Sequence, residues 1–415
     1  MDQIISADRQ DLSVLRPPER DLRLDLFRGV GQWMIFLDHI PHDLVNWLTL
    51  RNYGFSDAAE FFVFISGYLA GFIYGPAVRG GYFLAATKRL MKRVWQLYVA
   101  HIFLFLLFTA QVARTAKRFD NPMYEDEFNV FNFLQHPDVM IGQALTLKYK
   151  PVNFDVLPLY MALLFATPLI LWCLVRRPAL ALFGSVVLYV AARWFDWNLP
   201  SYPAGSSWYF NPFAWQMMFV FAAWCGLGGS AQLQFLIRSR AALAVAVAWL
   251  AFAFLIVMTW HSAFLESLVP KWLIKVIYPI DKSDLDMLRF THFLALALVV
   301  VRFVPRNWPP LMSKWLQPLM ACGGIRSRYS ASGYFCRFRR TGSSPSIPRV
   351  LPSSSSSARS ASRSWWRPPD YWTGTRRCQC CSRRPRRSPR PSPRRRDGVP
   401  ADRTRMSRRL LGHPC

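Results

Sequence analysis

Two ionisable residues, Arg28 and His39, stand eleven residues apart at the first long apolar run of the chain, residues 29–46. Charged groups inside membrane-spanning segments are costly and mark functional sites by default. In a helix, eleven residues make about three turns and about 16 Å, so both side chains project from one face. Because histidine titrates near neutral pH, His39 is the candidate for proton transfer.

Asp38 precedes His39 and is a third catalytic candidate of this run. Successive helical side chains diverge, so Asp38 need not orient the His39 ring. A plainer interpretation stays open, in which Arg28 anchors the helix at the membrane interface and His39 is a polar helix end.

The second apolar run opens with a pair of carboxylates, Asp57 and Glu60, and continues to Ser66-Gly67. Their spacing is typical of a capping box with Asp in place of Ser or Thr. The alternative is that Asp57, Glu60 and Ser66 bind substrate. Gly67 would let a backbone or a ligand approach closely. No Gly-x-Ser-x-Gly pattern surrounds Ser66, which argues against a nucleophilic serine.

Four cations gather in residues 88–93, before the third apolar run. Arg89, Lys92 and Arg93 would suit the phosphates of a cofactor such as coenzyme A. The competing interpretation is that these charges only set the membrane topology. Other polar residues in or beside the runs are more often satisfied packing residues than catalysts; they are His101, Asp155, Asn211, Gln216 and His292.

Eight apolar runs must position these groups, in a chain that is 52% hydrophobic and 18% charged. They cover residues 29–46, 58–76, 94–112, 155–175, 179–195, 208–229, 241–263 and 287–304. A helix crosses the hydrocarbon core with about 20 residues. The composition excludes a disordered chain, and the runs predict an all-α, polytopic membrane bundle of about eight intact transmembrane helices.

The basic residues of the connecting segments favour a cytoplasmic N-terminus. Segments assigned to the inside carry 17 Lys and Arg, against 11 in much longer outside segments. By the positive-inside rule, residues 1–23 and the loop 76–93 are cytoplasmic, and residues 113–154 form the longest outside loop. No cleavable signal peptide is visible.

Residues 323–415 differ in composition from the membrane domain, residues 24–322. From residue 325 on, the tail has 23 Arg and no Lys. A basic interaction arm and a lipid-contacting cytoplasmic tail are two interpretations. Out-of-frame translation of a GC-rich gene fits the missing Lys better, and a permitted reading in another frame restores an apolar helix. We therefore expect a disordered tail. Its Cys378-x-Cys380-Cys381 lacks a second ligand pair, so no metal site is predicted.

Several longer motifs carry a family resemblance. They are Arg28-Gly29, Asp38-His39-Ile40-Pro41, the segment 49–60 that ends Ser56-Asp57-Ala58-Ala59-Glu60, Phe64-Ile65-Ser66-Gly67-Tyr68 and Arg93-Val94-Trp95-Gln96-Leu97-Tyr98. Together they resemble the OpgC family over about residues 20–322, most strongly over 20–101.

This resemblance implies a bacterial inner-membrane acyltransferase that typically has ten helices. The Arg/Lys-x10-His motif of the wider superfamily matches Arg28 and His39. The Arg-x-x-Arg motif is matched imperfectly, by Arg89-x-x-Lys92 and Arg93-x-x-Gln96. The resemblance implies transfer of a succinyl group from cytoplasmic succinyl-CoA, a co-substrate, to periplasmic glucan. The implied partners are this or another envelope glycan and the lipid bilayer, with no nucleic acid.

A second function class stays open, because a transporter or flippase for a carbohydrate would also place charged groups inside the membrane. Such a protein is expected to show internal repeats with broken helices, and the sequence shows none. Against the family pattern of ten helices, we expect the chain as written to lack part of the ninth helix and all of the tenth.

Overall fold

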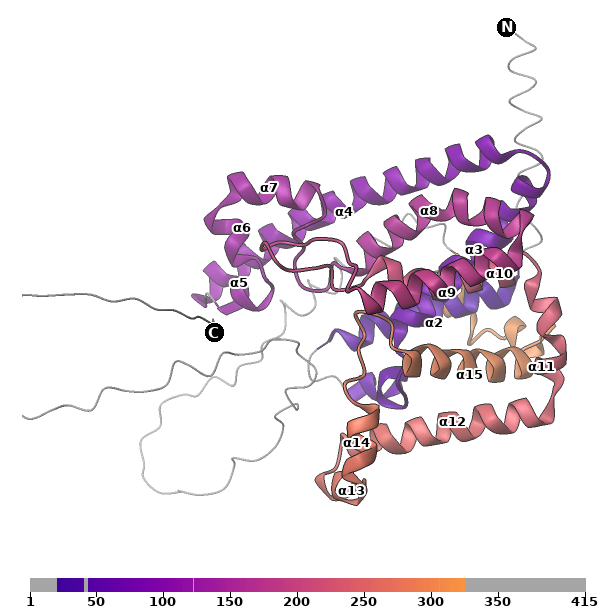
Figure 1. Cartoon of the computed structure of the whole chain (residues 1–415). Coiled ribbons are helices and arrows are strands. Elements are labelled where there is room, and N and C mark those ends of the chain that lie inside the picture. Colours follow the sequence, from indigo (N-terminus) through magenta and orange to yellow (C-terminus); the bar gives the residue numbers. More distant parts are fainter. Residues whose placement is uncertain (1–20, 41–43, 122, 306, 325–415) are drawn as a thin grey trace, which may run out of the picture. The chain divides into compact units, whose positions relative to one another are not determined.

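The computed structural model describes residues 21–40, 44–121, 123–305 and 307–324, which fall within one compact unit, Met1–Ser353. The described residues are helical, with a single isolated bridge between Pro200 and Ser207 and no strand (Figure 1). The all-α prediction is therefore confirmed for this part. The tail predictions, and those for residues 1–20, concern residues outside the described ones.

Eight longer helices form the bundle, and each overlaps one of the eight predicted runs. They are α2 (Leu22–Asp38), α3 (Ala58–Arg79), α4 (Phe83–Phe119), α8 (Val156–Arg176), α9 (Pro178–Trp194), α10 (Pro212–Gly226), α12 (Arg240–Thr259) and α15 (Met287–Phe303). Shorter elements connect them or follow them: η1 (Leu44–Leu48), η2 (Leu50–Asn52), α5 (Met123–Glu127), α6 (Phe131–Gln135), α7 (Pro137–Leu145), η3 (Gly229–Leu233), α11 (Gln234–Arg238), α13 (Ala263–Leu268), α14 (Lys271–Ile277), η4 (Pro309–Met312) and α16 (Gln317–Gly324).

Four helices of the described chain, α3, α4, α8 and α12, are long and apolar enough to cross a membrane by themselves. A fifth span results if α10 and residues Gly229–Arg238 count as one, although they are bent by 92°. Helices α2, α9 and α15 have 17 residues each. The protein is thus a helical membrane protein, and the number of eight spans stays a prediction.

Two helix boundaries differ from the predicted ones. Asp21 caps α2, so this helix starts seven residues before the apolar run and ends at Asp38. Pro41 disfavours helical geometry in the residue before it, which explains the early end. Helix α4 has 37 residues, about 55 Å at 1.5 Å per residue. Residues 88–93 therefore lie inside α4, and the predicted loop 76–93 shrinks to the turn at residues 80–82.

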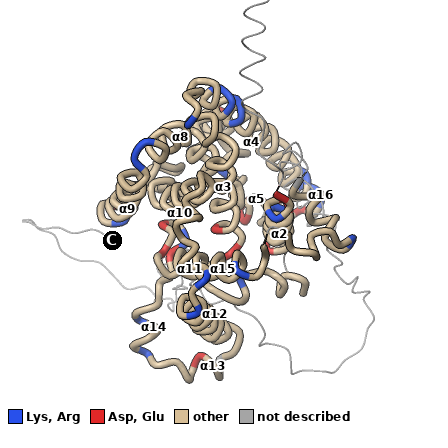
Figure 2. Tube along the Cα trace, turned by 90° about the vertical axis from the view of Figure 1, so that its right-hand side faces the viewer, with Lys and Arg blue, Asp and Glu red and all other residues tan. Residues whose placement is uncertain are grey.

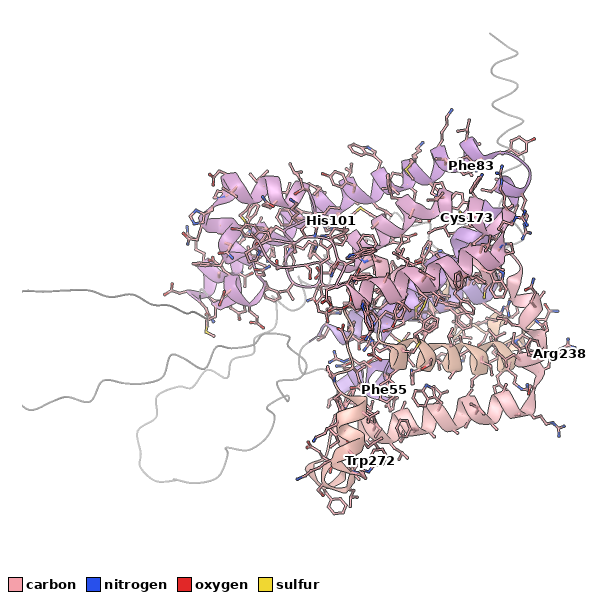
Figure 3. All side chains as sticks on the ribbon, in the orientation of Figure 1. Phe55, Phe83, His101, Cys173, Arg238 and Trp272 are labelled. Carbon is pink, nitrogen blue, oxygen red and sulfur yellow. The ribbon has the colours of Figure 1, made fainter. Side chains whose placement is uncertain are left out.

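Hydrogen bonds between elements show that the long helices alternate in direction. At one end, Arg79 donates to Leu227 O and Arg302 donates to Ile237 O. We call this the Arg238 end, and Figure 3 labels Phe83, Cys173 and Arg238 there. The opposite end, which we call the Asp57 end, carries the start of α3 and the loop before α15. The alternation agrees with the predicted up-and-down order of spans.

Helix α10 occupies the centre of the core, where Trp215, Met218 and Phe219 are fully buried. It packs against α3, α8 and α9. The contact with α3 requires glycine, because a Cβ on Gly67 would collide with the backbone carbonyl of Phe219. The expected close approach at Gly67 is therefore confirmed, as is usual for small residues between membrane helices.

Residues of the predicted outside loop 113–154 form a small helical lobe of α5, α6 and α7 beside the end of α4. It has its own apolar cluster, in which Phe105 contacts Phe133 and Tyr149 edge-on. Ser201 and Tyr202 both donate a hydrogen bond to Lys148 O. These bonds hold residues 148–155 against the Asp57 end of the bundle.

Candidate functional site

A small cavity of about 80 Å³ lies among α2, α3, α4 and α8. It is lined by Arg28, Gly31, Gln32, Phe61, Phe62, Ile65, Ser66, Leu69, Arg93, Leu97, Leu157 and Tyr160. Three of the sequence-predicted site residues, Arg28, Ser66 and Arg93, thus meet here from three different helices. We call this site the arginine cavity.

Tyr160 of α8 is the polar centre of the arginine cavity. Its side chain lies close to those of Ser66 and Arg93, and Arg28 lies within electrostatic range of it. No Asp or Glu lines the cavity, and the ion pairs found among the described residues include neither Arg28 nor Arg93. Two guanidinium groups without a carboxylate partner form a site that attracts an anion.

The other two predicted cofactor residues do not line the arginine cavity. Arg89 lies one turn before Arg93 on α4, and both are within electrostatic range of Tyr74 on α3. Lys92 is exposed on another face of α4. The helix therefore separates the cations that the sequence places next to each other, because neighbouring helical residues point in different directions.

His39 is the C-cap of α2 rather than a residue of its interior. Its Nδ1 lies 2.8 Å from the carbonyl oxygen of Ile35, one turn earlier. A carbonyl oxygen only accepts, so Nδ1 carries the proton and Nε2 carries the lone pair of the neutral ring. The backbone orients the histidine in a tautomer suited to a base that uses Nε2. His39 is not among the residues that line the arginine cavity.

Asp38 points elsewhere, as expected for the neighbour of His39. Its carboxyl group lies near Thr49 and within electrostatic range of Asp57 and Lys282. Arg51 donates to the backbone oxygen of Asp38 at 3.2 Å. The Oδ1 atom of Asp38 is buried without a hydrogen-bond partner among the described residues. Asp38 therefore belongs with the charged groups at the Asp57 end.

Four charged side chains form a compact network there, and we call it the Asp57 network. Lys282 and Arg289 approach Asp57 Oδ2 at 2.5 and 3.1 Å, and Arg289 Nε donates to Glu60 Oε1 at 2.6 Å. Glu60 is fully buried and Arg289 is 3% exposed. Two positive and two negative charges balance each other, which is the condition for burying ions at tolerable cost.

Asp57 and Glu60 also form the capping box that the sequence predicts. Asp57 Oδ1 accepts from Ala59 N, and Glu60 Oε2 accepts from Asp57 N, both at 2.8 Å. The two carboxylates therefore start α3 and bind α15 at once. The capping interpretation is confirmed, and the substrate-binding role of Asp57, Glu60 and Ser66 stays a prediction.

The sequence analysis does not single out Arg289 and Lys282 as members of a charged site. Arg289 sits in the predicted run 287–304, so a charge inside a span was the available signal. Lys282 lies in a loop, and no local pattern marks it. The same loop is fixed to α10, since Asn211 donates to Asp284 Oδ1 at 2.7 Å and Trp215 Nε1 donates to Ser283 O at 3.0 Å.

Most of the remaining polar residues of the runs have hydrogen-bond partners on other segments of the chain. Ser56 Oγ lies 2.7 Å from His292 Nδ1, and Ser185 Oγ donates to Gln216 Oε1 at 2.7 Å. His101 is 2% exposed, and its Nδ1 has no hydrogen-bond partner among the described residues. Apart from His101, these residues behave as satisfied packing residues.

A second, looser ion pair lies just before α8. Lys150 Nζ is 3.8 Å from Asp155 Oδ1 and 4.2 Å from the centre of the Trp208 ring. Burial lowers the pKa of Lys150 to about 8 and raises the pKa of Asp155 to about 6, and each shift is reduced by the charge of the partner. Both groups thus stand near their titration points at neutral pH.

Comparison with known proteins places the chain in a family. The family described as OpgC protein matches residues 20–326, which include the arginine cavity and the Asp57 network. Comparison with curated proteins and with solved structures gave no significant match. Because the match covers well over half of the 415 residues, the chain belongs to the OpgC family.

Proposed function

We propose that this protein is a membrane acyltransferase that moves a succinyl group from cytoplasmic succinyl-CoA to a hydroxyl group of a periplasmic glucan. Family membership supports the acyltransferase class. In this proposal the Arg238 end of the bundle faces the cytoplasm of the bacterial inner membrane, and the Asp57 end, with His39, faces the periplasm.

The observation that carries the choice of acyl group is the arginine cavity. A succinyl group ends in a carboxylate, whereas an acetyl group is neutral. Arg28 and Arg93 meet in about 80 Å³ without an acidic partner among the residues that the structure describes, and this space suits a carboxylate and is too small for a nucleotide. A carboxylate held by guanidinium groups makes the strong class of hydrogen bond. We therefore assign Arg28 and Arg93, with Ser66 and Tyr160, to the succinyl group.

The chemistry asks for a base at the acceptor side. His39 Nε2 takes the proton of the sugar hydroxyl while its oxygen attacks the thioester carbonyl. The C–O bond of the new ester forms and the C–S bond breaks. The departing thiolate of coenzyme A receives the proton, so atoms and charge balance. Asp38 would make the electrostatic potential near the acceptor hydroxyl more negative. Arg89 and Lys92, nearer to the Arg238 end, remain candidates for the donor phosphates.

The test is acyl transfer by the full chain in proteoliposomes, with glucan and radiolabelled succinyl-CoA or acetyl-CoA. We expect label in the glucan with succinyl-CoA and a preference of at least about tenfold over acetyl-CoA, the value of one charge-assisted hydrogen bond. Arg93→Gln is expected to abolish this preference. Lys92→Gln is the matched control for the preference. Lys92 is the exposed neighbour on the same helix, and any phosphate contact it makes is common to both donors, so the preference should stay unchanged.

Two outcomes would contradict the proposal. Equal use of both donors, or an unchanged preference in Arg93→Gln, would remove the arginine cavity from donor selection. Movement of unmodified glucan across the membrane, without labelled ester, would favour the carrier alternative.

A further inference from the structure

An open apolar groove runs between α4 and α8 on the outer surface of the bundle, separate from the arginine cavity. Its volume is about 460 Å³, within the range of about 300 to 1,000 Å³ that is usual for small-molecule sites. It is lined by Phe83, Thr87, Met91, Phe165, Pro168, Leu169 and Trp172. The Thr87 hydroxyl donates to Phe83 O at 2.9 Å, so this polar group is satisfied within its own helix.

The lining favours a flexible hydrocarbon. Phe165 and Leu169 are 67% and 65% exposed, so the surface is available and strongly apolar. Met91 can adapt its shape to an irregular chain. On a helical membrane protein such a groove is surrounded by lipid tails. The polar residues at its end therefore determine which lipid headgroup binds there.

The end of the groove is basic. The guanidinium of Arg176 lies 4.4 Å from the centre of the Trp172 ring, directly beside the lining, and Arg177 follows it. Lys88 is exposed next to Thr87. Neither residues 83–119 nor residues 156–195 contain a single Asp or Glu. Figure 2 looks onto this end of the helices and shows blue Lys and Arg segments at α4 and α8.

We propose that this groove, together with Arg176, binds one anionic phospholipid. One acyl chain lies along α4 and α8, and the phosphate is held by the guanidinium that stacks on Trp172. Arginine suits this task because its planar group donates to phosphate in pairs and stacks on an aromatic ring at the same time. The site does not depend on the proposed acyltransferase activity.

The test is lipid retention by the purified full chain in mild detergent, measured by native mass spectrometry. Phosphatidylglycerol and phosphatidylcholine with identical acyl chains are the two lipids. Arginine-rich residues 325–415 also attract anionic lipid, so the readout is the difference between variants. We expect Arg176→Gln to weaken binding of phosphatidylglycerol about tenfold, and Arg176→Lys to weaken it less.

Two further variants separate the site from general charge and from bulk lipid. Arg238→Gln removes an exposed cation at the same end that does not touch the groove (Figure 3), and we expect it to bind like the unchanged protein. Thr87→Trp fills the groove and is expected to abolish the specific site. Equal weakening by Arg176→Gln and Arg238→Gln, or undiminished retention by Thr87→Trp, would overturn the proposal.

Discussion

The arginine cavity and the Asp57 network both place arginines inside the bundle, but they treat charge in opposite ways. In the Asp57 network, Arg289 contacts two carboxylates, and the four charges sum to zero. In the arginine cavity, Arg28 and Arg93 face a tyrosine and a serine. Compensated charge holds helices together, whereas uncompensated charge is kept for a ligand. The predictions below test this division.

The largest effect is expected from Arg289→Met. This change leaves Glu60, which is fully buried, without its direct ion-pair partner. Breaking a buried ion pair on one side costs about 3–5 kcal/mol. Thermal unfolding in detergent should therefore show a strongly destabilised protein. The double variant Arg289→Met/Glu60→Met keeps the Lys282–Asp57 pair and should recover most of the stability. Equal melting of both variants would show that the network is not the cause.

His39→Ala should act on rate and not on stability. A histidine general base contributes a factor of about 10² to 10⁴, so transfer should fall at least about a hundredfold. The melting temperature should change little, because His39 stands at the C-cap of α2 and its Nδ1 bonds to a carbonyl of its own helix. His136→Ala removes an exposed histidine and should keep full activity. A His39→Ala protein with normal rates would exclude this residue from the mechanism.

Arg28→Gln should raise the KM for succinyl-CoA by about tenfold to a hundredfold, the range of one hydrogen bond to a charged group. Arg28→Lys should restore part of the affinity. The contrast with Arg289 is the essential point, because Arg28→Gln breaks no ion pair within the described part of the chain and should not lower the melting temperature. A loss of stability like that of Arg289→Met would place Arg28 among the structural charges.

Local patterns in the sequence predict much of this arrangement. Apolar runs locate all eight long helices, the Asp57–Glu60 spacing predicts the capping box, and Gly67 predicts the close contact with α10. The boundaries of the apolar runs do not predict the ends of a helix where that helix continues into charged sequence. Asp21 starts α2 before the apolar residues begin, and residues 88–93 continue α4 as a helix.

The partners of the charged groups could not be predicted in the same way. Arg289 meets Glu60 across 229 positions of sequence, and no periodicity reports a contact of that kind. The arginine cavity needs Tyr160, which resembles any other aromatic residue of an apolar run. Spacing on one helix shows which residues share a face, and only the packing of helices decides which faces meet.

Lys150 is intermediate between the compensated charges of the Asp57 network and the uncompensated charges of the arginine cavity. Its side chain is 4% exposed, and its only ion-pair partner among the described residues, Asp155, is 3.8 Å away. Burial lowers its pKa from 10.5 to about 8. Between these values the unfolded chain binds more protons than the folded protein, so stability rises with pH in this window. From pH 8 to pH 9 the gain should be on the order of 1 kcal/mol.

The measurement is thermal unfolding at pH 8, 9 and 10 for the unchanged protein and for Lys150→Met. Tyrosines, cysteines and other lysines titrate alike in both, so the difference between the two proteins isolates Lys150. Lys148→Met removes an exposed lysine two positions away and should keep the full pH dependence. If Lys150→Met gains as much stability with rising pH as the unchanged protein, Lys150 stays charged when folded. The Asp155 pair would then count as compensated, like the Asp57 network.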